Sequence, residues 1–142
     1  METYTLCTDG GARGNPGPGS IGFALYDEGG TLIHKEGRPI GVCTNNQAEY
    51  QALIEGLKVA SGFTKGDILH ISDSELLVKQ VTGEYRVKNP VLKNLHAQVR
   101  AGRLRFEHVQ HRHERRDYPG IKVADKILNH AADRDEIVIN DN

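Results

Sequence analysis

The sequence predicts an α/β fold, a five-stranded mixed sheet flanked by helices. Five apolar or alternating segments are typical of strands and four capped or amphipathic segments of helices, in the order β-β-β-α-β-α-α-β-α. The first three strands follow one another closely, which favours antiparallel pairing. Strands that return through helices lie parallel to their neighbours, so we expect the first, fourth and fifth strands to be parallel.

The first three strands are expected at residues 3–8, 21–26 and 31–36. The first ends at Asp9 and leads into a Gly- and Pro-rich loop over residues 10–19. The second and third are joined by the turn sequence DEGG at residues 27–30, which is typical of a hairpin.

Helices are expected at residues 47–61, 74–81, 90–100 and 122–132, and the later strands at residues 68–72 and 104–110. Either Asn45 or Asn46 can cap the first helix. Asn89 caps the third helix, with Pro90 at its first position. The fourth strand ends at Asp73.

The length and composition favour one globular domain. A chain of 142 residues, 37% hydrophobic and 26% charged, can bury one core and is too short for two ordinary domains. We expect residues 1–132 to form this domain and residues 133–142 an acidic tail, whose apolar residues 137–139 either dock or fray. Without an apolar span, a signal-peptide layout or a disulfide framework, we expect a soluble cytoplasmic monomer and no membrane partner.

The charges are unevenly distributed along the chain. Residues 76–116 carry ten Lys and Arg against three Asp and Glu, whereas residues 117–142 carry three against six. A basic block of this kind suggests a polyanionic partner, and it is also compatible with a solvated helix face.

Three acidic residues occupy positions where folding alone rarely places them. Asp9 and Asp73 end two predicted strands, and Glu49 heads the apolar stripe of the first helix. If the first and fourth strands are parallel neighbours, Asp9 and Asp73 lie side by side at their carboxyl ends, where open α/β sheets place their sites. Divalent cations with oxygen ligands relieve the repulsion between such charges, so the pattern predicts a metal site.

Each of these acids also has a structural explanation when it is taken alone. A strand-end Asp often forms a turn, and an acid in the first turn of a helix, such as Glu49 or Asp125, interacts favourably with the helix dipole. The Gly-rich loop lacks a nucleotide-binding ending, but it offers a surface that the backbone of a large ligand can approach.

Four segments resemble the motifs of type 1 ribonuclease H, in the order of that family. They are residues 8–17 (TDGGARGNPG), 44–50 (TNNQAEY), 72–74 (SDS) and 124–129 (ADKILN). The first two motifs are highly specific, and the resemblance covers residues 3–132. Because only residues 82–89 join the middle helices, the chain resembles the compact form without a basic protrusion.

The resemblance implies a ribonuclease H-like fold and an endonuclease that hydrolyses the RNA strand of RNA/DNA hybrids, leaving 5′-phosphate and 3′-hydroxyl ends. The family binds two Mg²⁺ ions, or Mn²⁺ as a substitute, through four acids, which here are Asp9, Glu49, Asp73 and Asp125. In such sites the ions lie roughly 3.5–4 Å apart, one activating water and the other stabilising the leaving oxygen. Asp9 would bridge both ions, with Glu49 and Asp73 on one side and Asp125 on the other.

The resemblance also implies substrate contacts. The loop backbone at Gly10 and Gly11 and the positions of Asn15 and Asn45 meet ribose hydroxyls in the family, and Asn46 matches a position that faces the DNA strand. The 2′-hydroxyl is what distinguishes RNA from DNA at such a site.

The chain departs from the family pattern in two further places. Glu75 stands where the family commonly has a Gln that touches the hybrid. The loop His that assists product release best matches His113, with His111 and Arg112 as alternatives. The remaining candidates for phosphate contacts are Lys79, Arg86, Lys88, Lys93, Arg100 and Arg103, and we expect binding to weaken with salt.

Three alternatives remain open at this point. The enzyme could also cut double-stranded RNA, because the A-form shape is shared. The domain could bind hybrids or RNA without catalysis, since fold does not determine activity. A zinc site at His108, His111 and His113 is the least supported, because no Cys accompanies these residues.

Overall fold

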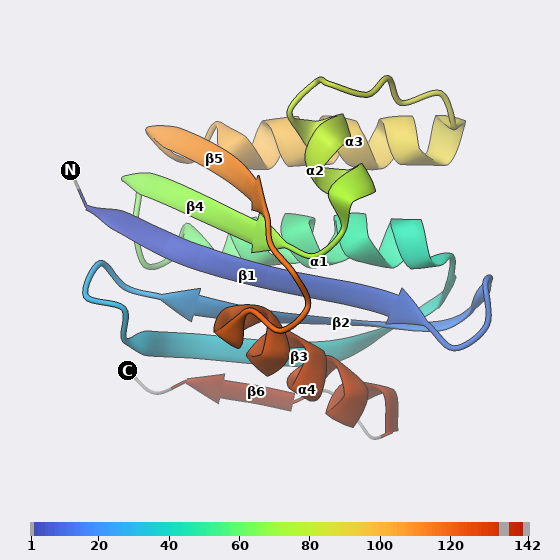
Figure 1. Cartoon of the computed structure of the whole chain (residues 1–142), viewed down its shortest axis with the longest axis horizontal. Helices are drawn as coiled ribbons and strands as arrows, with labels where there is room; N and C mark the ends of the chain where they lie inside the picture. Colours follow the sequence, from blue (N-terminus) through green and yellow to red (C-terminus); the bar gives the residue numbers. More distant parts are fainter. Residues whose placement is uncertain (1, 134–136, 141–142) are drawn as a thin grey trace.

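A six-stranded mixed sheet forms the centre of the computed structural model (Figure 1). In spatial order the strands are β5 (His108–His113), β4 (Asp67–Ser72), β1 (Thr3–Ala12), β2 (Gly17–Tyr26), β3 (Leu32–Cys43) and β6 (Ile137–Asn140). The first three strands pair antiparallel, and β1, β4 and β5 are parallel, as predicted. The structure describes residues 2–133 and 137–140.

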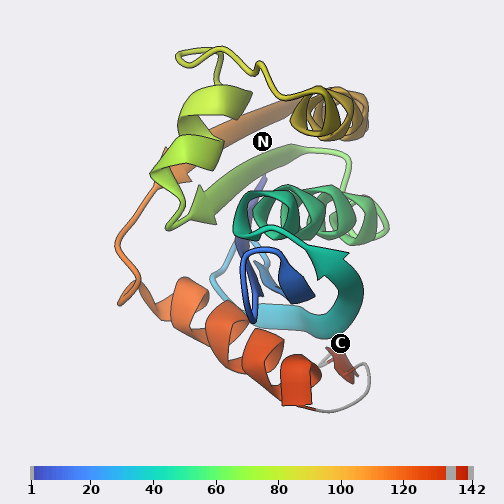
Figure 2. The same cartoon turned by 90° about the vertical axis from the view of Figure 1, so that its right-hand side faces the viewer.

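Helices cover both faces of this sheet (Figure 2). They are α1 (Asn45–Ala60), α2 (Glu75–Val81), α3 (Pro90–Arg103) and α4 (Pro119–Asp133). On one face α1 packs against β1 and β2, with α3 beside it, and on the other face α4 packs across β1, β2 and β3. None of the described helices is long and apolar enough to cross a membrane.

The core lies mainly between α1 and the sheet. Its fully buried members include Leu6 of β1, Phe23 of β2 and Leu53 of α1, which lie on the faces that the sequence periodicity predicts. On the opposite face α4 lies directly on the sheet, because β2 has Gly22 there and a Cβ at this position would overlap the carbonyl oxygen of Ala124.

α1 begins beside the C-terminal end of β1, where Asn45 contacts Ala12, whereas α4 begins against Cys7 and ends near Arg13. The second turns of both helices therefore face the middle of β1, where the candidate site lies.

The predicted loop over residues 10–19 is largely strand. β1 continues to Ala12 and β2 begins at Gly17, with Ala12 opposite Gly19. Asp9 therefore lies within β1 and not at its end. The strand continues because Gly10 has no side chain, so the backbone of β1 can pass close to the carbonyl of Ala48 in α1.

Thr44 caps α1, so the expectation of Asn45 or Asn46 as the cap is wrong. The Thr44 hydroxyl accepts a hydrogen bond from the N–H of Gln47 (3.2 Å), and the Gln47 side chain accepts one from the N–H of Thr44 (3.0 Å). This reciprocal capping box satisfies two helix-terminal donors. Asn45 and Asn46 are the first two residues of the helix, and their side chains remain available for other contacts.

Two predicted boundaries near β5 are also wrong. The strand expected at residues 104–110 is β5 at His108–His113, because α3 continues to Arg103. The inner face of α3 extends this far, since Val99 is buried and Gly102 lies against Leu57 of α1. The last helix begins three residues earlier than expected, at Pro119.

The expected tail contributes a strand. Residues 137–140 form β6 and pair antiparallel with β3, so this run docks on the sheet. Residues 134–136 and 141–142 of the expected tail lie outside the described residues.

Candidate active site

Carboxylates from four elements line one cleft of about 340 Å³ at the end of the parallel strands. Asp9 comes from β1, Glu49 from the second turn of α1, Asp73 from the residue after β4, and Asp125 from α4. The register places Asp9 beside Asp73, because Thr8 and Ser72, the preceding residues, are paired neighbours. The four acids proposed from the sequence are therefore neighbours in space.

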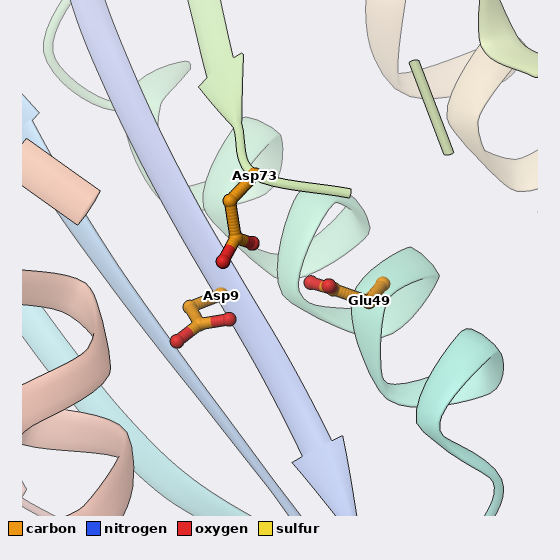
Figure 3. A group of neighbouring side chains, drawn as sticks. All are labelled: Asp9, Glu49 and Asp73. Carbon is orange, nitrogen blue, oxygen red and sulfur yellow. The ribbon is translucent and has the colours of Figure 1, made fainter. Parts of the chain in front are cut away.

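Three of these acids form a tight group. Asp9, Glu49 and Asp73 each offer a carboxylate oxygen, and these oxygens all lie within 4.8 Å of one another (Figure 3). Asp125 is outside this group but contacts Asp9 through a side-chain hydrogen bond across the cleft. Clustered carboxylate oxygens are the ligands that Mg²⁺ and Mn²⁺ prefer, so the donor set fits a divalent cation of this class.

The cleft carries an excess of negative charge. Burial, the charge of Asp73 and the contact with Asp125 together raise the pKa of Asp9 to about 8. Burial also raises the pKa of Glu49 well above its usual value, with added repulsion from Asp9 and Asp73. Such groups remain protonated near neutral pH unless a cation enters, so this arrangement favours the binding of positive charge.

Glu49 is held in place by the backbone of β1. The N–H of Gly10 donates a hydrogen bond to Glu49 Oε1 at 2.9 Å. This bond favours the charged form and so opposes part of the rise in the pKa of Glu49. A carboxylate of α1 is thus oriented toward the acids of β1 and β4.

Two asparagines join the β1–β2 connection to α1. The side-chain oxygen of Asn45 accepts a hydrogen bond from the N–H of Ala12, and that of Asn15 accepts one from the N–H of Asn45, both at 2.9 Å. Their amide NH₂ groups remain as donors toward a ligand. Gly11 lines the cleft beside Asn45, whereas Asn46 is exposed at the start of α1.

Arg116 is a charged residue at this cleft that sequence reasoning missed. Its Nε donates a 3.3 Å hydrogen bond to Asp73 Oδ2, while its own side chain is 79% exposed. Among the described residues that line the cleft, it is the only cation. The adjacent pair Arg115-Arg116 before α4 could have indicated this basic group. The resemblance to type 1 ribonuclease H pointed instead to residues 110–114.

The structure does not bring His113 into this cleft. His113 ends β5, exposed and beside Ser72, where a loop position was expected. Of the two alternatives, His111 is occupied by a 2.8 Å hydrogen bond to His70, and Arg112 pairs with Glu114. Glu75 is exposed at the start of α2 and lies 3.9 Å from Lys79.

The zinc alternative has no support in residues 2–133. The acids Asp9, Glu49 and Asp73 are the only group of three potential ligands that the structure brings within reach of one ion there. His108 instead contacts Asp67, at the far end of β4 from Asp73.

A family model described as reverse transcriptase-like matches residues 7–131 of this chain. Ribonuclease HI of Halobacterium salinarum is 42% identical over 92 residues, which cover 65% of this chain and 46% of that protein. The chain spans less than half the length of the first curated relatives that it matches.

Solved structures are similar over nearly the whole chain. The crystal structure of RNase H1 from Halobacterium salinarum has a TM-score of 0.88 and 36% identity, covering 92% of this chain and 98% of that one. The structure of LC11-RNase H1 in complex with an RNA/DNA hybrid has a TM-score of 0.85 and 37% identity, covering 92% and 96%.

Proposed function

The chain belongs to the type 1 ribonuclease H family, within the reverse transcriptase-like family, and on that premise we propose that it cuts the RNA strand of RNA/DNA hybrids. The proposed reaction is endonucleolytic hydrolysis that leaves 5′-phosphate and 3′-hydroxyl ends. The observation that carries it is the convergence of Asp9, Glu49, Asp73 and Asp125 on one cleft.

We propose that these four acids hold two divalent ions, Mg²⁺ or Mn²⁺ in its place. Asp9 lies between the other acids, since it is near Asp73 and Glu49 and in contact with Asp125, which supports a shared, bridging role. Bound ions of this kind supply an activated water and neutralise charge at the leaving oxygen.

The protein's own groups would position the hybrid. We propose that the backbone of Gly10 and Gly11 and the amides of Asn15 and Asn45 meet the ribose 2′-hydroxyls beside the cut. Asn46, exposed at the start of α1, would face the DNA strand. Glu75 follows Ser74, which lines the cleft, and its negative charge would weaken rather than strengthen a phosphate contact there.

For product release we propose a different basic group from the one that the sequence pattern favours. His113 stays the candidate that the family pattern favours, but Arg116 is the basic group that reaches the cleft. Because its side chain is largely exposed, Arg116 can leave Asp73 for a phosphate when a cation occupies the cleft. We therefore propose Arg116 for this role, with His113 as the alternative.

We also propose the remaining expectations from the sequence. These are a single domain, expected over residues 1–132 and extended by β6 of the same sheet, action as a monomer, a cytoplasmic location and cutting of double-stranded RNA in addition to hybrids. The hybrid stays the favoured substrate, because the similar LC11-RNase H1 was solved in complex with one.

The test is gel cleavage of end-labelled duplexes by the purified protein. We expect Mg²⁺-dependent cutting of the RNA strand of a hybrid, loss of cutting in EDTA, and no cutting of the DNA strand. Equal cutting of double-stranded RNA would establish the broader specificity. Binding of the hybrid without cutting in either Mg²⁺ or Mn²⁺ would instead establish a non-catalytic binding domain.

A further inference from the structure

A second cleft, of about 740 Å³, adjoins the carboxylate cleft along the start of α4. We call it the α4 cleft, and it is lined by Arg115, Arg116, Asp117, Lys122, Val123, Asp125 and Lys126. Arg116 and Asp125 line both clefts, so the two form one continuous depression.

The charges of the α4 cleft are the opposite of those beside it. Four cations line it against two carboxylates, whereas four carboxylates line the first cleft against one cation. Lys122 and Lys126 are four residues apart on α4, so their side chains lie on the same face of the helix as neighbours. Arg115 and Arg116 approach them from the segment that precedes the helix.

These cations are available to a ligand. Arg115, Lys122 and Lys126 are exposed, and none of their side chains forms a hydrogen bond or ion pair with another residue of the described ranges 2–133 and 137–140. Unpaired cations in a concave site concentrate anions and release counterions when phosphates replace them. The α4 cleft therefore fits a chain of phosphates better than a single neutral ligand.

The place of the cleft indicates which strand it would meet. α2 and α3 lie on the side of β1 where β4 and β5 lie, whereas α4 packs across β1, β2 and β3 (Figures 1 and 2). The strand that is cut must pass over Asp125, and Asp125 is itself part of the α4 cleft. Continuing past the cut, that strand would reach Lys122 and Lys126.

We propose that the α4 cleft binds backbone phosphates of the RNA strand next to the phosphate that is cut, an inference that rests on the proposed function. Lys122, Lys126 and Arg115 make these contacts, and Asp117 opposes them. The site supplies electrostatic affinity for the hybrid on the α4 side of the cut. The protein has no basic protrusion to do this, because only residues 82–89 join its middle helices.

The net charges of the sequence segments on either side of residue 116 do not reveal this site. Lys122 and Lys126 belong to a segment that is acidic overall, and Arg115 and Arg116 end the basic block before it. Folding joins the two segments at the N-terminal end of α4. A cation cluster thus arises from neighbours whose regional averages have opposite sign.

The direct test is hybrid binding in EDTA, measured by fluorescence anisotropy over a range of salt concentrations. In the double variant Lys122→Ala/Lys126→Ala we expect binding weaker by about tenfold or more at 0.1 M salt, and a salt slope lower by up to roughly two. The matched control is Lys58→Ala/Lys65→Ala, which removes the same charge at exposed positions near the far end of α1. This control is expected to bind as the wild type does.

A variant that removes a negative charge from the α4 cleft is expected to change binding in the opposite direction. Asp117→Asn removes a carboxylate from the α4 cleft and is expected to tighten hybrid binding. Unchanged affinity and salt slope in both the lysine double variant and Asp117→Asn, in protein with a wild-type circular dichroism spectrum, would overturn the proposal.

Shortened substrates identify the strand. The RNA strand is truncated on one side of the cut at a time, and the DNA strand is left whole. For one of the two truncations we expect the difference in binding between the wild type and Lys122→Ala/Lys126→Ala, the lysine effect, to disappear. If the effect disappears only when the DNA strand is truncated, the assignment to the RNA strand is wrong. Because these measurements need no cleavage, a protein that fails to cut but shows the lysine effect would contradict the proposed function and leave this inference intact.

Discussion

The N–H of Gly10 in β1 donates a 2.9 Å hydrogen bond to Oε1 of Glu49 in α1. This bond joins the strand that carries Asp9 to the helix that carries a second acid of the cleft. It depends on close approach of the two backbones, which the absence of a side chain at Gly10 permits.

Gly10→Ala is expected to lower both stability and cleavage. The new Cβ would overlap the carbonyl of Ala48, so β1 and α1 must separate, at a cost of about 1–3 kcal/mol. Urea unfolding measures this change. The control Gly29→Ala lies in the exposed β2–β3 turn, where a Cβ meets Asp27 at an ordinary 3.5 Å, and should change stability little. Equal stability of the two variants would show that the close contact is not limiting.

Arg116→Ala is expected to lower the melting temperature in EDTA and to increase the stabilisation that Mg²⁺ provides. Arg116 partly compensates the charge of Asp73, and a bound cation would take over that task. Because the arginine is mostly exposed, the loss in EDTA should stay below about 1 kcal/mol. Thermal unfolding with and without Mg²⁺ measures both effects. Arg115→Ala is the adjacent control, and an identical response from it would remove Arg116 from the site.

The acids of the cleft predict a pH dependence for the metal-free protein. The folded-state pKa of Asp9 is about 8, above the ordinary 3.8, so the folded protein binds the extra proton between these values. The stability from this group is fully present below pH 3.8 and is lost as the pH rises through about 8. Asp9→Asn should therefore flatten the fall in unfolding free energy between pH 4 and 8 in EDTA. If the variant showed the same fall as the wild type, Asp9 would not be the group that titrates.

Two neighbouring histidines, His70 buried and His111 half-buried, predict a dependence of the opposite sign. Burial lowers the pKa of His111 to about 3 and that of His70 well below its usual value, and His70 also hydrogen bonds Thr8 at 2.8 Å. Their contribution to stability is present above pH 6.5 and is lost as the pH falls toward 3. His111→Gln should lose less stability than the wild type over this range in urea unfolding. The exposed His130→Gln is the control and should follow the wild type.

The sequence predicted five strands of the sheet and three of the acids because these depend on local patterns, whereas Asp125 was assigned only through the resemblance to type 1 ribonuclease H. Alternation and turn residues place the strands, and the register of parallel strands then brings Asp9 beside Asp73. Glu49 follows from its position on the apolar stripe of α1. These features needed no knowledge of how the helices pack.

Other features depend on packing across the fold. The end of α3 and the start of β5 are set by contacts of Val99 and Gly102 with α1, and no local pattern marks them. Arg116 reaches Asp73 because α4 and the segment before it lie over the ends of the strands, 43 residues beyond Asp73 in the chain. The α4 cleft likewise needs two segments of opposite average charge to meet.

The most direct test of the account is single-turnover cleavage of a hybrid by Asp73→Asn in Mg²⁺, together with its binding affinity in EDTA. We expect the cleavage rate to fall by roughly two to three orders of magnitude while binding stays within a few-fold of the wild type, because a cation ligand is lost and the phosphate contacts remain. Asp67→Asn, at the other end of β4, is the matched control and should cut normally. Cleavage by Asp73→Asn at the wild-type rate would contradict the assignment of this cleft as the catalytic centre.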